Sequence, residues 1–360
     1  WYTLMEIHWY TMAEIRQYGQ ILDWANSVDH PPLIIRGARQ VGKSYLVKWL
    51  AKNHFKNLIE INFEKKPELK SIFETKDAQK IITQLEVLFK NSIEVGKTII
   101  FLDEIQFCPE VLSSLRWFAE DLPKIHIVVT GSLLDFALSE FENSMPVGRV
   151  TYMYLEPFSY IEFIEALGEN QLAKFFENYK LNEKIPESIH LKAMSLFKEY
   201  IFIGGMPKAI RSFRDKRSLL EVEKIHRDLI ESFQNDFNKY RKRVPSERLK
   251  RVFDSITFQL GKKFSYSRVD REERSLAIKN ALELLLLARL GFKVYASYCN
   301  GIPLGAEIDE KNFKIYFLDV GMALTHLGFK LTDFKSINDI FIVNSGGIAE
   351  QFVAQMLRYT

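Results

Sequence analysis

The stretch Gly37-Ala38-Arg39-Gln40-Val41-Gly42-Lys43-Ser44 fits the pattern G-x-x-x-x-G-K-[ST] of a phosphate-binding loop (P-loop) at every fixed position. In this motif the glycines let backbone N–H groups close around the α- and β-phosphates. Lys43 reaches the β- and γ-phosphate oxygens, and the Ser44 hydroxyl ligates Mg²⁺. The apolar run 32–36 before the loop predicts a buried strand, and residues 45–52 predict a helix whose dipole favours anions at its start. This context favours a nucleotide site formed by residues 37–44 and Tyr45 over a glycine turn that binds nothing.

A second site feature is the run Lys97-Thr98-Ile99-Ile100-Phe101-Leu102-Asp103-Glu104. Its apolar character predicts a strand buried on both faces, and it ends in two adjacent carboxylates. Asp103 would hold Mg²⁺ through its water shell, and Glu104 would orient or deprotonate the water that attacks the γ-phosphate. The alternative is that both carboxylates open the next turn and cap a helix over residues 109–118. With a P-loop upstream, the pair indicates hydrolysis as well as binding.

Composition predicts a large protein of two or three domains, with mixed charge. The formal net charge of +3 is too small to argue that the whole molecule binds nucleic acid. Cys108 and Cys299 lie far apart in sequence, which favours a reducing compartment, and the histidines form no ligand-spaced group for zinc. No apolar run is long enough to span a bilayer. The opening residues from Trp1 are unlike a signal peptide, and we expect the natural start at Met5, Met12 or upstream. We therefore expect a cytoplasmic protein without a membrane partner.

Strand and helix patterns alternate along the chain to about residue 155. Strands are predicted at 57–63, 124–130 and 150–155, and helices at 78–91 and 109–118. This order predicts a parallel sheet covered by helices on both faces, with nucleotide at the carboxyl ends of the strands. From residue 156 to about 240 the pattern is helical throughout, which predicts an all-α lid.

Two further positions suit an ATPase of the AAA+ kind. The fourth strand ends in Thr130-Gly131-Ser132, where Ser132 is our first choice for a side chain that senses the γ-phosphate through the attacking water. Ser132 is equally suited to cap a helix over 133–141, and the two roles are compatible. Arg149 precedes the fifth strand, where AAA+ proteins place an arginine finger that neutralises charge on a neighbouring subunit's transferring phosphoryl group. The alternative for Arg149 is a plain solvent-exposed arginine.

Residues 246–321 have the pattern of a winged helix-turn-helix. Helices are predicted at 247–260, 266–270 and 271–290, and β runs at 292–296 and 313–318. The third helix of such a module can enter a major groove, but winged helices also mediate protein contacts, so both partners stay open. A basic cluster able to contact phosphates lies just upstream and within the first helix: Lys239, Arg241, Lys242, Arg243, Arg248, Lys250 and Arg251.

Several motifs together resemble the uncharacterised archaeal and bacterial AAA+ ATPases of the STAND-related branch. Besides the P-loop and residues 102–106, they are Thr130-Gly131-Ser132, Gly148-Arg149, Leu155-Glu156-Pro157-Phe158-Ser159-Tyr160, Gly204-Gly205-Met206-Pro207 and Tyr316-Phe317-Leu318-Asp319-Val320-Gly321. The resemblance implies an ATPase core, a helical lid, a winged helix-turn-helix and a C-terminal region of unknown function. That region is often nuclease-like in the family. Here Ala306-Glu307-Ile308-Asp309 is better explained as the hairpin of a wing, since no Glu-x-Lys strand follows, and we expect no DNA cleavage.

The sequence thus predicts an α/β P-loop NTPase of the AAA+ kind, with a parallel sheet, an α-helical lid and a winged helix-turn-helix. The expected domains are a core at 1–155, a lid at 156–243, a winged helix at 244–325 and the start of a truncated C-terminal region at 326–360. The expected cofactors are ATP and Mg²⁺. We expect Lys43, Ser44, Asp103 and Glu104 to carry the chemistry, with lid and winged helix moved by the nucleotide state.

The partners in view are ATP or ADP, DNA through the winged helix, and other copies of the chain or another protein. Two rival functions stay open. One is a nucleotide-gated DNA-binding switch with slow turnover, and the other is a nucleotide kinase or related phosphotransferase. The helical lid, the adjacent carboxylates and the lack of a recognisable acceptor site argue against a kinase.

Overall fold

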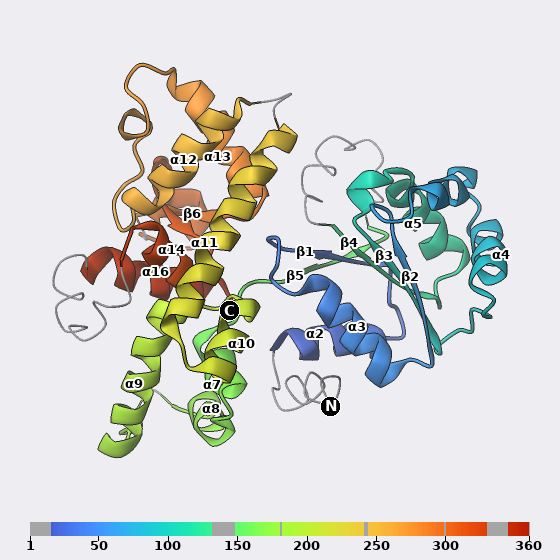
Figure 1. The fold of residues 1–360 in the computed structure, drawn as a ribbon, viewed down its shortest axis with the longest axis horizontal. Helices are drawn as coiled ribbons and strands as arrows, with labels where there is room; N and C mark the ends of the chain where they lie inside the picture. Colours follow the sequence, from blue (N-terminus) through green and yellow to red (C-terminus); the bar gives the residue numbers. More distant parts are fainter. Residues whose placement is uncertain are drawn as a thin grey trace. The chain divides into compact units, whose positions relative to one another are not determined.

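The computed structural model describes residues 16–131, 148–180, 182–240, 244–298, 300–329 and 345–359. The described residues form two compact units divided between Glu156 and Pro157, which we call the N-terminal and the C-terminal unit (Figure 1). In the described part of the chain, no helix is both long and apolar enough to cross a bilayer.

The N-terminal unit is a parallel five-stranded sheet in the order β2-β3-β4-β1-β5, with helices on both faces (Figure 1). Its elements are α2 (Arg16–Asn26), β1 (Leu33–Arg36), α3 (Lys43–His54), β2 (Asn57–Asn62), η1 (Pro67–Thr75), α4 (Ala78–Phe89), β3 (Thr98–Asp103), η2 (Ile105–Phe107), α5 (Glu110–Asp121), β4 (His126–Thr130) and β5 (Thr151–Tyr154). The predicted α/β fold with a parallel sheet is confirmed. The five predicted strand runs lie within two residues of the strands observed.

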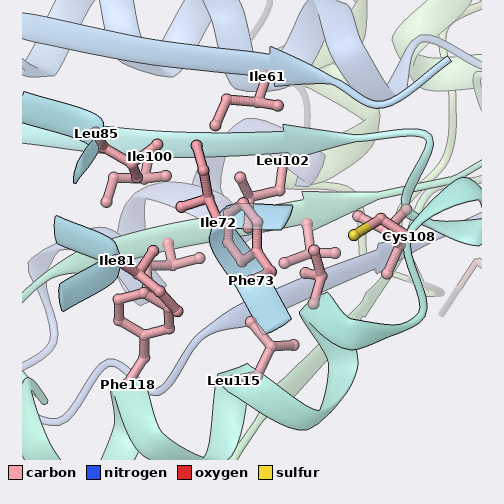
Figure 2. Close-up of a cluster of buried hydrophobic side chains, with 14 of the residues drawn as sticks. Ile61, Ile72, Phe73, Ile81, Leu85, Ile100, Leu102, Cys108, Leu115 and Phe118 are labelled. Atoms are coloured by element: carbon pink, nitrogen blue, oxygen red, sulfur yellow. The ribbon is translucent and has the colours of Figure 1, made fainter. Parts of the chain in front are cut away.

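The sheet is buried on both faces, which explains why its central strands are continuous apolar runs. One face of β2, β3 and β4 packs against η1, α4 and α5 in a core that includes Ile100 and Leu102. Figure 2 shows Leu115 and Phe118 rising from α5 into this core. The alternate strand residues, such as Ile99 and Phe101, are equally buried and point to the face that α3 covers. Burial of both faces fixes the strand register, and the register sets which side chains meet at the strand ends.

The C-terminal unit begins with helices only, as expected for this stretch, and ends with a helix and ribbon region. Its elements are α7 (Tyr160–Ala166), α8 (Asn170–Glu177), α9 (Glu187–Ile203), α10 (Pro207–Lys216), α11 (Leu219–Asp236), η4 (Phe237–Tyr240), α12 (Ser246–Phe258), η5 (Tyr266–Arg268), α13 (Ser275–Leu287), β6 (Gly291–Ser297), η6 (Leu304–Glu307), β7 (Ile308–Phe317), α14 (Val320–His326) and α16 (Ser345–Arg358). Strands β6 and β7 form an antiparallel ribbon.

The region 246–317 differs from the predicted pattern in its middle. The second helix expected over 266–270 is only the single turn η5, and the third begins at Ser275 rather than at residue 271. Ion pairs from α12 hold the connecting residues: Arg251 binds Asp270 at 2.5 Å, and Arg248 binds Glu273 at 2.5 Å. These pairs fix the connection outside the helix. The winged-helix interpretation of this region stays a prediction.

A buried carboxylate, Asp319, joins two of the motifs quoted above. It accepts hydrogen bonds from the backbone N–H of Gly205 at 2.6 Å and of Met322 at 3.0 Å, and burial raises its pKa. Gly204 has φ 67°, and a Cβ there would lie 2.0 Å from the Asp319 Oδ1 atom. Glycine is therefore required at this joint, which connects the end of α9 to the start of α14.

Candidate functional site

The loop between β1 and α3 is shaped by close backbone approach. A Cβ on Gly37 would lie 2.3 Å from the backbone oxygen of Leu155, so no larger residue fits without a shift of the chain. Gln40 and Gly42 have positive φ values of 65° and 102°. This succession of unusual conformations turns the chain tightly from the strand into the helix, as a phosphate-binding loop requires. Ala38 and Val41 are buried under the loop.

Lys43 lies within this loop and only 7% of it is exposed. Its Nζ donates hydrogen bonds to the carbonyl oxygens of Gly37 at 2.9 Å and Ala38 at 2.8 Å. The ammonium group is thereby held in the concave side of the loop. Helix α3 begins at Lys43 with no side-chain cap, so the N–H groups of its first turn face the same position. A cation and a helix N-terminus together favour an anion here.

Asp103 is the last residue of β3, and its carboxylate accepts hydrogen bonds from several neighbouring groups. Its Oδ1 accepts hydrogen bonds from the backbone N–H of Glu104 at 3.0 Å and from the Thr130 hydroxyl. Its Oδ2 accepts from the Ser44 hydroxyl at 3.1 Å and from the Asn62 amide at 3.3 Å. The structure thus brings together Ser44 and Asp103, the two residues predicted to hold the metal. Four donors on one carboxylate fix its orientation closely.

Asn62 and Thr130 are the neighbours of Asp103 that sequence reasoning assigned no role. Asn62 ends β2 and Thr130 ends β4, the strands on either side of β3. The Asn62 side chain also accepts hydrogen bonds from the backbone N–H of Glu64 and Lys65, which orients its amide toward Asp103. A polar residue at the end of a buried run was the only available signal. Ser132, which we preferred to Thr130, lies outside the described residues.

Glu104 follows Asp103 in a left-handed backbone conformation with φ 55°. A non-glycine residue pays for this conformation in strain, and such strain clusters at functional sites. The Gln106 amide donates a hydrogen bond to the Glu104 carboxylate, which positions it. Of the alternative, the turn is observed, because Glu104 directly precedes the single turn η2. The helix cap is not observed, because α5 follows Pro109 and has no side-chain cap.

The remaining predicted residues lie at the loop surface or far from it. Tyr45 is 37% exposed on α3, Gln40 is exposed in the loop, and Arg39 is half-buried. Arg149 precedes β5, so it lies at the amino edge of the parallel sheet, opposite the edge that carries Lys43 and Asp103. There its Nε donates to the Glu120 carboxylate at 3.0 Å.

Residues 29–164 match the model of a family described as an AAA domain. A further match, over residues 194–333, is to a domain of unknown function (DUF8612). A comparison with curated proteins found no match.

Among solved structures, the chain is similar to the Walker-type ATPase paby2304 of Pyrococcus abyssi. The two share 15% identity at a TM-score of 0.56, over 88% of this chain and 96% of that chain. The Aeropyrum pernix ORC2 protein, solved in ADPNP and ADP complexes, shares 14% identity at a TM-score of 0.42, over 95% and 92% of the two chains. The first of these shows that the two chains share a fold. The second adds no argument.

The residues at the end of β3 and the start of α3 fit a magnesium ion better than a softer metal. Ser44 and Asp103 offer only oxygen ligands, and their side chains meet at 3.1 Å. Mg²⁺ typically takes one or two protein ligands and leaves the rest to water and phosphate. The residues that the structure describes contain no cluster of three histidine, cysteine or acidic side chains able to hold a metal by itself. A metal here would need the phosphates of a bound nucleotide.

Proposed function

We propose that the chain binds ATP with Mg²⁺ and hydrolyses it. The observation that carries the proposal is the contact of Ser44 with Asp103 beside the buried Lys43 ammonium. It places a hydroxyl, a carboxylate and a cation at one end of a helix, in the arrangement that phosphoryl transfer uses. Residues 37–45 would hold the triphosphate, and Ser44 and Asp103 would hold Mg²⁺. The metal would neutralise charge on the phosphate oxygens.

Each side chain then has a separate task. The Lys43 ammonium leaves the loop carbonyls and pairs with phosphate oxygens, which replaces neutral hydrogen-bond partners with charged ones. Glu104 takes a proton from the attacking water or orients it, and Gln106 keeps the Glu104 carboxylate in place. Thr130 and Asn62 keep Asp103 fixed, so its position does not change as charge develops. Ser132 remains our candidate for the residue that senses the γ-phosphate.

We further propose that nucleotide state moves the helices of 156–243 together with the winged helix of 244–325. The hydrogen bonds of Asp319 support a movement of the two parts together, because they connect the α9–α10 loop to the start of α14. The alternative function is a nucleotide-gated DNA-binding switch with slow turnover. Multiple-turnover phosphate release favours the ATPase, whereas salt-sensitive DNA binding with negligible turnover favours the switch.

The proposed base is tested with Glu104→Gln, which keeps the shape of the side chain and removes its basicity. ATP should bind as before, while phosphate release should slow by about two to four orders of magnitude. Glu110→Gln, at the first residue of α5, is the matched control and should release phosphate at the parent's rate. Unchanged phosphate release by Glu104→Gln would remove Glu104 from the mechanism.

A further inference from the structure

Two arginines of the predicted basic cluster, Arg248 and Arg251 on α12, are neutralised by ion pairs in the structure. Arg248 pairs with Glu273, and Arg251 pairs with both Asp270 and Glu273. The side chains of Lys239 and Tyr240 and all of residues 241–243 lie outside the described part. Of the expected cluster, the described residues thus leave only Lys250 without a carboxylate partner. The connection from α12 to α13 has three acidic residues, Asp270, Glu272 and Glu273, and these ion pairs involve two of them, Asp270 and Glu273.

That connection and the start of α13 carry cations that remain unpaired. Over the residues that the structure describes, six exposed side chains here make neither an ion pair nor a side-chain hydrogen bond: Lys262, Lys263, Arg268, Arg271, Arg274 and Lys279. The only unpaired carboxylate among them is that of Glu272, which is exposed. Elsewhere in this region Lys293 and Lys314 are bound by Glu283 and Glu350. Unpaired positive charge is therefore concentrated in the segment 262–279.

The surface at this place is hollowed. A hollow of about 450 Å³ is lined by Ser265, Ser267, Arg268 and Arg271, together with Val269 and the ion-paired Asp270. A second hollow of about 320 Å³ continues past Arg268 toward Phe258 of α12. Hydroxyl groups beside guanidinium groups are typical phosphate contacts, because both donate hydrogen bonds to phosphate oxygens.

Helix α13 presents an exposed face beside these hollows that carries both polar and apolar side chains. Its inward side is buried through Ile278, Ala281, Leu282 and Leu285. Lys279 and Asn280 are exposed on the outward side together with Leu276 and Leu287, and Ser275 is exposed at the start of the helix. Thirteen residues span about 20 Å, and a major groove about 12 Å wide admits such a helix. An asparagine amide can pair with an adenine edge, and a lysine with guanine. Farther along the helix, Glu283 is bound by Lys293 at 2.6 Å, which removes its repulsion of phosphate.

We infer that this surface binds duplex DNA. Helix α13 enters the major groove with Lys279 and Asn280 toward the base edges, while Arg268, Arg271 and Arg274 contact the flanking phosphates. This inference deepens the DNA-binding alternative given above, and it does not depend on ATP hydrolysis. It assigns the contact to the connection before α13 and to α13 itself, not to the predicted basic cluster upstream of and within α12.

The test is fluorescence anisotropy with a labelled duplex of about 25 base pairs, titrated between about 50 mM and 200 mM salt. The parent should bind with an affinity that falls steeply with salt. The variant Arg268→Ala/Arg271→Ala/Arg274→Ala should bind at least about thirtyfold more weakly, with a salt slope smaller by about two to three. The control Lys174→Ala/Lys184→Ala/Lys208→Ala removes the same charge from exposed, unpaired lysines of the helical segment, and it should bind like the parent.

Several outcomes would contradict the proposal that this surface binds duplex DNA. They are no binding by the parent at the lowest salt, equal losses in the two triple variants, or tighter binding of single strands than of duplex. Arg271→Glu alone should weaken binding about tenfold or more and guards against misfolding of the triple variant. All titrations are repeated in Lys43→Ala protein. If DNA binding persists there while the parent hydrolyses no ATP, the proposed ATPase fails and the surface stands.

Discussion

His226 is the histidine whose protonation the fold opposes most clearly. It is fully buried on α11, with Nδ1 at 3.0 Å from the Thr325 hydroxyl and Nε2 at 3.0 Å from the Ile203 carbonyl oxygen. Burial lowers its pKa from the ordinary 6.5 to about 4. Between pH 6.5 and about 4, His226 is protonated in the unfolded chain but stays neutral in the folded chain. The stabilisation is therefore complete above pH 6.5 and is lost as the pH falls toward 4.

The prediction is that the free energy of unfolding falls by about 3 kcal/mol over this range because of His226 alone. Urea unfolding of the parent and of His226→Gln measures it, since glutamine gains no proton. The two stabilities should converge as the pH is lowered. His190→Gln, at an exposed histidine on α9, is the control and should follow the parent. Parallel stability curves for the parent and His226→Gln would contradict this account.

The site residues show how far single positions can be predicted. The positions of the loop 37–44, Asp103 and Glu104 at strand and helix ends were predictable because each is marked by a local pattern: a fixed spacing, or a buried run with a carboxylate at its end. Their roles stay predictions. Asn62 and Thr130 were not predictable, since their role depends on the order β2-β3-β4, which places three strand ends side by side. Arg248 and Arg251 were predicted as phosphate contacts, but partners about twenty residues away neutralise them.

At the scale of elements, buried strands were the most predictable because burial on both faces demands an uninterrupted apolar run. The helices near the C-terminus were less predictable, because buried polar side chains fix their packing through hydrogen bonds to distant backbone groups. Gln351 of α16 is an example: its amide both accepts from the Phe317 N–H at 2.8 Å and donates to the Phe317 carbonyl oxygen at 2.9 Å. The Gln351 side chain thus satisfies the backbone N–H and C=O of a β7 residue from the neighbouring helix. No local sequence pattern predicts such a contact.

Gln351→Met keeps the length of this side chain and removes both hydrogen bonds. The buried N–H and C=O of Phe317 would lose their partners, so the free energy of unfolding should fall by about 2 to 4 kcal/mol. Val353→Ala, at an exposed position on the same helix, should change it by less than about 0.5 kcal/mol. Thermal and urea unfolding compare the two variants. A Gln351→Met protein as stable as Val353→Ala would mean that α16 is held by apolar contacts instead.

At the scale of the whole molecule, the position of Arg149 bears on assembly. Because it lies at the amino edge of the sheet, it cannot reach the P-loop of its own N-terminal unit, so a catalytic role requires a second copy. Turnover per subunit should then rise with protein concentration. Arg149→Ala should lower turnover by about three orders of magnitude with nearly unchanged ATP affinity, because a finger binds chiefly the transition state.

Arg116→Ala is the matched control for Arg149→Ala, since Arg116 pairs with the same Glu120 carboxylate at 3.2 Å. It should leave turnover unchanged. Mixing Arg149→Ala with Glu104→Gln subunits should partly restore activity, because some interfaces then combine an intact arginine with an intact base. Turnover independent of concentration, or no rescue despite demonstrated co-assembly, would leave Arg149 as a surface residue paired with Glu120.

The central claim is that the loop 37–44 binds the phosphates of a nucleotide through Lys43, and calorimetric titration with ATP and Mg²⁺ tests it most directly. Lys43→Ala should bind at least about a hundredfold more weakly than the parent, because phosphate charge is then left without its cation. Lys48→Ala removes the same charge from an exposed position on the same helix, where the lysine pairs with Glu60, and should bind like the parent. Equal ATP affinity of Lys43→Ala and the parent would contradict the account.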